Sequence, residues 1–240
     1  MRLSISKIEE FEKCKYSYFL TNIKKEVTQQ EPEQLVKGKE LHSFFEDIYK
    51  EEITKMDIKD FERMKDEKIK AVEQKAKAHP LYSKYPEQTT KFIDFVKKNG
   101  IPLYTEEHLY DAELNIAGII DRVDYDGKDL RILDYKTGKP SDINKHYFQL
   151  GIYTYLFIKN HNDILQPTHW GIHYSESGQT ITEKIKWNVV RKALMKVSDV
   201  RKKIGETTLK DEWNKTPSPL CKWCRHFKDN GGVCDANGKI

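Results

Sequence analysis

Residues 115–138 read NIAGIIDRVDYDGKDLRILDYKTG, and this stretch decides the fold. Two apolar stretches of strand length end in Asp121 and in Asp134, and Asp126-Gly127 between them is typical of a hairpin turn. A hairpin would bring both aspartates to one end of a sheet, and Lys136 would share the face of Asp134. Each fragment alone could be a polar strand end or a surface ion pair. Because aspartate is disfavoured in strands, two such acids together favour a site.

The residue types of this hairpin indicate a particular chemistry. Two carboxylates offer the oxygen ligands that Mg²⁺ or Mn²⁺ prefers, and these ions accept phosphate oxygens as further ligands. A lysine beside such an ion can help to deprotonate a metal-bound water or stabilise the charge that develops on an attacked phosphate. The pattern therefore predicts metal-dependent chemistry on a phosphate ester.

The apolar periodicity around the hairpin predicts one domain over residues 1–240, with helices first, then three strands, a helix, two strands and a helix. A first helix is expected from a capping box at Ser6 and Glu9 to about Cys14. This order predicts an α/β chain with a central mixed sheet flanked by helices. Its expected parts are a helix at 35–50, a helical insertion at 51–100, a sheet core at 103–187 and a cysteine-rich tail at 216–240.

Four motifs keep a characteristic order along the chain. They are Gly38-Lys39-Glu40-Leu41-His42, Gly118–Asp121 (GxxD), Asp134–Gly138 (DYKTG) and Gln149–Tyr153 (QLxxY). Together they resemble the RecB-like nucleases of the PD-(D/E)XK superfamily, whose restriction-endonuclease-like core the chain would share. Ile120 stands where the superfamily name has a proline.

The resemblance also implies roles for single residues. Lys136 would position or activate the attacking water. Gln149 and Tyr153 lie four apart on one helix face and would contact the catalytic lysine or the substrate, although Tyr153 alone is more often a core aromatic. The implied metal ligands are His42, Asp121, Asp134 and the backbone carbonyl of Tyr135.

The cysteines suggest a second metal site. One lies before the nuclease motifs and three follow them, at Cys14, Cys221, Cys224 and Cys234. Four thiolates fit either Zn²⁺ or a [4Fe-4S] cluster. The layout of one plus three resembles the iron–sulfur subgroup of the family, which includes AddB-type subunits, exonuclease V and the CRISPR adaptation nuclease. The resemblance implies a structural [4Fe-4S] cluster that fastens the tail to the first helix, with zinc as the alternative.

Positive charge is concentrated toward the end of the chain. The formal net charge is only +4, but residues 183–225 hold twelve Lys and Arg against five Asp and Glu. This segment is either a phosphate-facing surface or the solvated face of a helix. Arg201, Lys202 and Lys203 are the candidate DNA contacts.

These patterns lead to one expected function and two alternatives. The resemblance implies a Mg²⁺- or Mn²⁺-dependent DNA exonuclease, with single-stranded ends favoured, in DNA repair, recombination or phage DNA processing. The sequence holds no G-x-x-x-x-G-K-[ST] motif, so a helicase or recombination protein would be a separate partner. The alternatives are a non-cleaving nucleic-acid-binding or scaffold subunit of the same fold and a small zinc protein that binds RNA.

Composition restricts the location. Hydrophobic residues make up 38% of the 240 residues and charged residues 33%, and no apolar run approaches the ~20 residues of a membrane helix. The first residues, MRLSISKIEEFEKC, lack the apolar segment of a secretory signal. We therefore expect a cytoplasmic protein with no membrane partner.

Overall fold

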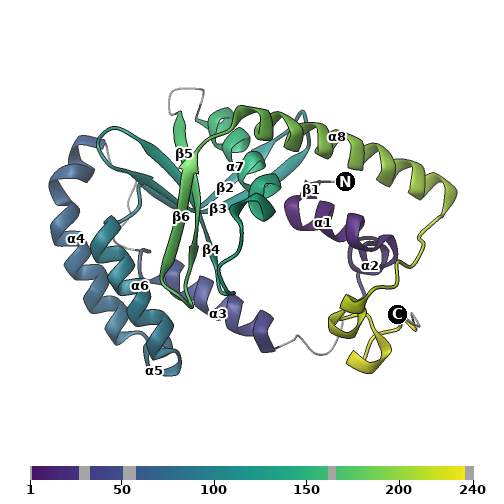
Figure 1. The fold of residues 1–240 in the computed structure, drawn as a ribbon, viewed down its shortest axis with the longest axis horizontal. Helices are drawn as coiled ribbons and strands as arrows, with labels where there is room; N and C mark the ends of the chain where they lie inside the picture. The colour runs from purple at the N-terminus through teal and green to yellow at the C-terminus, as the bar shows by residue number, and fades with distance from the viewer. Residues whose placement is uncertain (1, 27–32, 51–57, 162–165, 236–240) are drawn as a thin grey trace.

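The computed structural model describes residues 2–26, 33–50, 58–161 and 166–235, with the side chains of 58–65 left out of the description. Within these ranges the chain forms a six-stranded mixed sheet flanked by helices (Figure 1), which confirms the expected α/β class. The strands are β1 (Leu3–Ser4), β2 (Tyr104–Asp111), β3 (Ile116–Tyr125), β4 (Leu130–Lys136), β5 (Pro167–Tyr174) and β6 (Gln179–Lys184).

The three central strands follow one another as the hairpin signals predict. β2, β3 and β4 are antiparallel neighbours, whereas β5 runs parallel to β4 and antiparallel to β6. β3 and β4 pair from Tyr125 and Leu130 up to Arg122 and Leu133. Beyond Arg122 and Leu133 the two strands are no longer paired. The two strands therefore fork, and the fork opens where each strand carries an aspartate.

Helices pack on the sheet from several sides. The helical elements before the central strands are α1 (Ile5–Lys13), α2 (Lys15–Tyr18), η1 (Phe19–Lys24), α3 (Glu33–Asp47), α4 (Ile58–Ala78), α5 (Pro80–Lys84) and α6 (Pro86–Asn99). Those that follow are η2 (Ile143–His146), α7 (Tyr147–Asn160), α8 (Trp187–Lys210), η3 (Pro219–Trp223) and η4 (Lys228–Asn230). α7 packs against both the sheet and α8, where a Cβ at Gly151 would come within 3.0 Å of the Cβ of Ala193. This close approach explains why glycine stands in the middle of α7.

Aromatic side chains join α3 and α6 to β4. The rings of Phe45 and Phe92 stack with centroids 3.9 Å apart, and the ring of Tyr135 lies 4.8 Å from that of Phe45. All three rings are almost fully buried. The side chain of Tyr135 thus holds the end of β4 in the core, which fixes the position of its neighbours Asp134 and Lys136.

A buried ion pair also fixes this part of the core. The Arg122 side chain is fully buried, and its Nε donates to Asp124 Oδ1 at 2.6 Å. Its other nitrogens donate to the hydroxyl of Tyr49 at 2.7 Å and to the carbonyl of Gly100 at 2.6 Å. One guanidinium therefore links β3 to the segments that end α3 and α6.

The structure corrects one local prediction at the start of the chain and adds detail to another region. α1 is capped by Ser4, whose Oγ accepts from the backbone N–H of Lys7, so the expected capping box of Ser6 and Glu9 is wrong. The predicted end near Cys14 is confirmed. Within the helical insertion expected at 51–100, the short helix α5 begins at Pro80, which occupies the first position after the cap His79. Residues 51–57 of the predicted insertion lie outside the described residues.

The tail returns to the first helices of the chain, as Figure 1 shows beside α2. The indole of Trp213 stacks on the rings of Tyr18 and Phe19, and the hydroxyl of Thr21 lies 2.8 Å from Nε2 of His226. Residues about two hundred positions apart in sequence therefore form one lobe. None of the helices in the described ranges is both long and apolar enough to cross a lipid bilayer.

Candidate metal centre and active site

The two aspartates of the predicted site lie at the fork of β3 and β4. Both are almost fully buried, and Oδ2 of Asp121 accepts from the backbone N–H of Tyr135 at 2.7 Å. Burial raises the pKa of Asp121 well above its ordinary range, and repulsion from Asp134 and Glu106 raises it further. The acids of the fork therefore repel one another, and without a counter-ion they would be partly protonated.

Glu106 of β2 belongs to this site although no motif pointed to it. The pairs of Thr105 with Arg122 and of Glu107 with Ile120 place it opposite Asp121. Its φ of 47° lies in the left-handed region that few non-glycine residues adopt. Burial, followed by repulsion from nearby acids, raises the pKa of Glu106 to about 7. An acid inside a strand was the available signal, because strands disfavour carboxylates.

His42 of α3 lies beside these acids, and its role as a metal ligand stays a prediction. Its Nδ1 lies 3.7 Å from Oδ2 of Asp121. Burial lowers the pKa of His42 despite the nearby Asp134 and a backbone hydrogen bond with Tyr135 that both raise it. The imidazole is therefore held in the neutral form that binds metals. One ligand atom from each of His42, Glu106 and Asp121 lies within 4.8 Å of the others.

Asp134 has a different set of neighbours from Asp121. Its Oδ2 lies 2.6 Å from the ammonium nitrogen of Lys136, and its Oδ1 accepts from Nε2 of Gln149 at 2.7 Å. The Gln149 Oε1 in turn accepts from Lys136 at 3.1 Å, and Gln149 Nε2 lies 3.0 Å from the hydroxyl of Tyr153. The four predicted residues of β4 and α7 thus form one hydrogen-bonded network, in which Gln149 sets the position of Lys136 and Asp134.

The charge of this network bears on what Lys136 can do. Burial tends to lower the pKa of Lys136, but Asp134 and Asp121 outweigh burial and raise it overall. In the metal-free chain Lys136 is therefore a fixed cation. Such a group stabilises charge on a substrate more readily than it removes a proton.

The donor set fits a divalent metal ion. Three carboxylates, Glu106, Asp121 and Asp134, converge beside a neutral imidazole and one lysine, and two of the three have raised pKa values because of burial and mutual repulsion. A hard divalent cation would relieve this repulsion, and oxygen ligands with one imidazole suit Mg²⁺ or Mn²⁺. The group of ligand atoms that lie closest together differs from the expected ligand set. It contains Glu106 beside His42 and Asp121, whereas Asp134 is held by Lys136 and Gln149.

The four cysteines also come together. Cys14, Cys221, Cys224 and Cys234 line one cavity of about 610 Å³ between α1, α2 and the tail. All four are free thiols. Burial raises the pKa of the Cys224 thiol, and the other three cysteines raise it further through their charge. The four cysteines that the sequence suggests as one metal site therefore lie around a single cavity.

Backbone groups are directed at the sulfurs of this cluster. The N–H groups of Thr216 and Ser218 donate to Sγ of Cys14 at 3.5 Å and Sγ of Cys221 at 3.3 Å. The loop before Cys234 is tightly folded, because a Cβ at Gly232 would come within 2.2 Å of the backbone of His226. The residues between Cys224 and Cys234 therefore form a compact turn.

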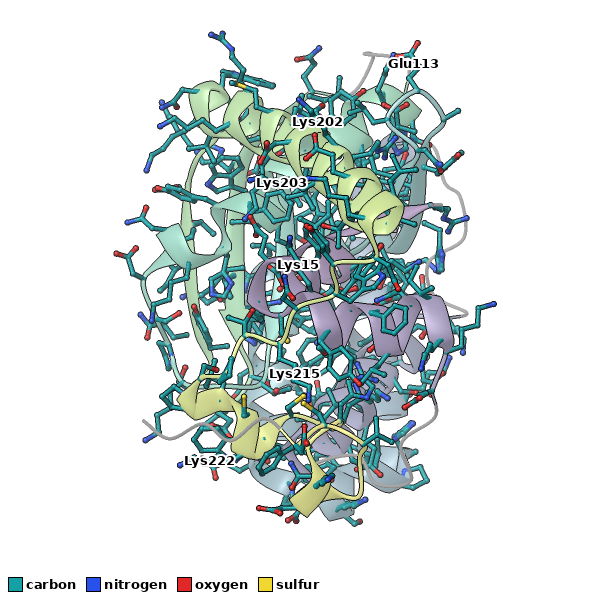
Figure 2. The ribbon with its side chains drawn as sticks, turned by 90° about the vertical axis from the view of Figure 1, so that its right-hand side faces the viewer. Lys15, Glu113, Lys202, Lys203, Lys215 and Lys222 are labelled. Carbon is teal, nitrogen blue, oxygen red and sulfur yellow. The ribbon has the colours of Figure 1, made fainter. Side chains whose placement is uncertain are left out.

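The three basic residues expected to contact DNA differ in their surroundings. Arg201 donates from its guanidinium to the carbonyls of Leu114 and Asn115, and so holds the turn between β2 and β3. Lys202 and Lys203 are exposed on α8. Figure 2 shows them on one face of the molecule with three further lysines, Lys15 of α2 and Lys215 and Lys222 of the tail.

Comparison with known proteins gives a family for the chain. Residues 2–227 match the family described as the PD-(D/E)XK nuclease superfamily. The chain belongs to this superfamily. The match spans all the motifs of the site, from His42 to Tyr153, and it includes three of the four cysteines.

Solved structures show the same fold for this PD-(D/E)XK chain. A crystal structure from Eubacterium rectale named "Putative exonuclease" has 14% sequence identity and a TM-score of 0.54, with 100% of this chain and 94% of that chain covered. At this identity the likeness concerns the fold alone. No curated protein matches the sequence.

Proposed function

We propose that this PD-(D/E)XK nuclease is a Mg²⁺- or Mn²⁺-dependent DNA exonuclease that acts on single-stranded ends. The observation that carries the proposal is the group of His42, Glu106 and Asp121, whose ligand atoms lie within 4.8 Å of one another beside the Lys136 network. The intact set of metal ligands and the lysine favours catalysis over a role as a non-cleaving subunit.

Each residue has a distinct part in this proposal. His42, Glu106 and Asp121 would hold the ion, with the Tyr135 carbonyl and Asp134 at its border. A bound ion supplies Lewis-acid polarisation of the phosphate and lowers the pKa of a coordinated water.

The chain's own residues would orient the substrate. Protonated Lys136 neutralises charge on a phosphate oxygen, since Asp134 and Gln149 hold its ammonium in place at 2.6 and 3.1 Å. Tyr153 keeps its proton, because burial and then Asp134 raise its pKa well above the ordinary value. Its hydroxyl accepts a hydrogen bond from Gln149 and so helps to fix the position of that side chain.

The direct test compares linear and circular single-stranded DNA, both labelled, with Mn²⁺ and with EDTA. We expect the linear strand to be degraded only with Mn²⁺ and the circle to persist. Cleavage of the circle would make the enzyme an endonuclease. Retention of DNA in a gel without cleavage of either substrate would favour the non-cleaving subunit instead.

Replacing Glu106 by glutamine should change both stability and metal binding. The pKa of Glu106 is about 7 in the folded chain against an ordinary 4.5, so its contribution to stability is full below about pH 4.5 and is lost as pH rises through 7. The metal-free Glu106→Gln protein should therefore melt at a higher temperature than wild type at pH 8. It should also show a smaller rise in melting temperature on addition of Mn²⁺.

Glu113→Gln is the matched control, because Glu113 is an exposed acid in the turn after β2. It should leave the melting temperature and its response to Mn²⁺ unchanged. An undiminished response to Mn²⁺ in Glu106→Gln would exclude Glu106 from the metal centre.

The proposal extends to a [4Fe-4S] cluster held by the four cysteines. Among the described residues no three of the sulfurs lie within 4.8 Å of one another, whereas thiolates on tetrahedral zinc are about 3.8 Å apart, given Zn–S bonds of about 2.3 Å. A four-iron cluster binds each thiolate through a different iron and spaces them more widely. The N–H groups directed at Cys14 and Cys221 would stabilise charged sulfurs.

Cys221→Ser should remove the cluster and loosen the tail. Anaerobically purified wild type should be brown with about four irons per chain, the content of the proposed cluster. The variant should be colourless, melt earlier and lose protection of its tail from protease, because metal binding contributes to folding. A conservative Ser218→Ala exchange should retain the iron. Stoichiometric zinc without iron in wild type would refute the cluster and leave the nuclease proposal intact.

Lys202 and Lys203 remain candidates for long-range attraction of DNA. The double variant Lys202→Glu and Lys203→Glu should weaken DNA binding and reduce the slope of log affinity against log salt by about 0.7 per lost single-strand phosphate contact. Arg201 is left intact because it holds the β2–β3 turn. Lys97→Glu with Lys98→Glu on α6 is the control. Equal slopes for the two double variants would mean that the α8 lysines are only a solvated face.

A further inference from the structure

A groove leads away from the catalytic network along the β2–β3 hairpin. Its cavity measures about 810 Å³ and begins at Lys136, Gln149 and Tyr153. It then passes the first residues of β1 and α1, which lie beside the hairpin because β1 pairs with β3. The cavity is therefore continuous with the proposed active site and extends it in one direction.

The floor of this groove is an open strand edge. On the side away from β2, β3 pairs with β1 through Ile116 and Ala117, and with β4 only from Arg122 onward. Within the described residues, Gly118–Asp121 has no strand partner on that edge. The edge leaves backbone donors and acceptors free to contact an extended ligand.

Cross-strand pairs form a path from the metal centre outward. Glu106 lies opposite Asp121, the next pair on the same side is His108 with Ile119, and the following pair is Tyr110 with Ala117. Tyr110 is 44% exposed and Ile119 39% exposed, so both side chains offer apolar surface to a ligand on this path. The four residue-to-residue steps from Glu106 to Tyr110 span about 13 Å, or no more than about four nucleotides of a stacked strand.

Cations border the same path. The Arg2 guanidinium lies over the Tyr110 ring, 5.3 Å from its centroid, and the Lys7 ammonium donates to the Arg2 carbonyl at 3.1 Å. Neither side chain forms an ion pair with a carboxylate among the residues that the structure describes. The acid that lines the groove, Glu9, lies toward Lys136, whose pKa it helps to raise. The outer end of the groove therefore carries uncompensated positive charge beside an exposed aromatic ring.

We propose that this groove is a binding subsite for the single-stranded DNA that flanks the scissile phosphate, with Tyr110 stacking on a base and Arg2 and Lys7 contacting phosphates. The inference rests on the proposed nuclease function and deepens it. Exposed aromatic and apolar groups beside cations are the features with which proteins bind unpaired bases, whose faces are hidden in a duplex. The subsite lies within about four nucleotides of the cleaved bond.

The experiment compares the hydrolysis of a single-stranded hexanucleotide with that of a dinucleotide, both with Mn²⁺. Wild type should have a higher kcat/KM for the hexanucleotide, and this preference should fall at least about fivefold in Tyr110→Ala and in Arg2→Ala, the lower end of what one stacked base contributes. Tyr110→Phe should retain the preference, because the stacking face is kept. The matched control is Arg131→Ala, which removes a half-buried arginine paired with Asp126 at the far end of β4.

A binding measurement separates the subsite from catalysis. In the Asp134→Ala background, adding Tyr110→Ala should weaken binding of a labelled hexanucleotide by a similar factor, as read by fluorescence anisotropy. If wild type cuts the hexanucleotide and Tyr110→Ala keeps the full preference and affinity, the subsite is wrong and the nuclease stands. If wild type cuts neither substrate, the proposed function fails.

Discussion

Asp134→Ala is expected to lower the rate of DNA cleavage at least about a hundredfold. This is the order of loss when one preorganised charged group is removed from an active site. Asp134 holds Lys136 at 2.6 Å and Gln149 at 2.7 Å, so its loss leaves both without the partner that orients them. Folding should survive, because removal of this carboxylate also removes repulsion that raises the pKa of Asp121. Initial rates of degradation of end-labelled DNA under saturating Mn²⁺ measure the effect.

Asp94→Ala on α6 is the matched control, since Asp94 is an exposed acid outside the hydrogen-bonded network of the fork. Its rate should equal that of wild type, and thermal unfolding should confirm that both variants are folded. Near-normal turnover of Asp134→Ala would mean that the reaction takes place elsewhere in the chain.

Asp124→Ala should cause the largest loss of stability among single changes in the core. Among the hydrogen bonds of the described residues, it would leave the fully buried guanidinium of Arg122 those to the neutral Tyr49 hydroxyl and the Gly100 carbonyl, and no carboxylate partner. Breaking one partner of a buried pair typically costs about 3–5 kcal/mol in the free energy of unfolding. Urea denaturation followed by circular dichroism would show this as a lower midpoint.

An exposed ion pair provides the comparison. Asp199 and Lys203 lie 2.7 Å apart on α8 with both side chains 56% exposed, so Asp199→Ala should cost less than about 1 kcal/mol. The double exchange Arg122→Met with Asp124→Leu should recover much of the stability lost in Asp124→Ala, because two apolar groups leave no buried charge. Similar losses for Asp124→Ala and Asp199→Ala would contradict the role of the buried pair.

The hairpin and its acids could be predicted because their signals are local. The alternation of apolar residues, the Asp126-Gly127 turn and the two aspartates lie within one short segment, and the structure forms β3, β4 and their fork there. The helix with Gln149 and Tyr153 lies where it was expected, between the third strand of the hairpin region and the last two strands. The roles of these residues in catalysis stay predictions.

The features that could not be predicted depend on partners distant in sequence. Glu106 belongs to the site only because the register of β2 on β3 places it opposite Asp121. Arg201 looked like part of a basic run, yet it packs on a turn 86 residues earlier. β1 contains only Leu3 and Ser4, which is too short for a periodic signal, and it forms because β3 offers an edge.

The return of the tail to the first helices has a consequence for how the molecule is made. Thr21 and His226, which meet at 2.8 Å, are 205 residues apart. On a ribosome that adds about 5–20 residues per second, η1 would therefore wait about 10–40 s for this partner to be synthesised. During that interval the rings of Tyr18 and Phe19, which later stack on Trp213, would be exposed on the nascent chain. The nascent chain therefore carries α2 and η1 without their aromatic cover until Trp213 has been made.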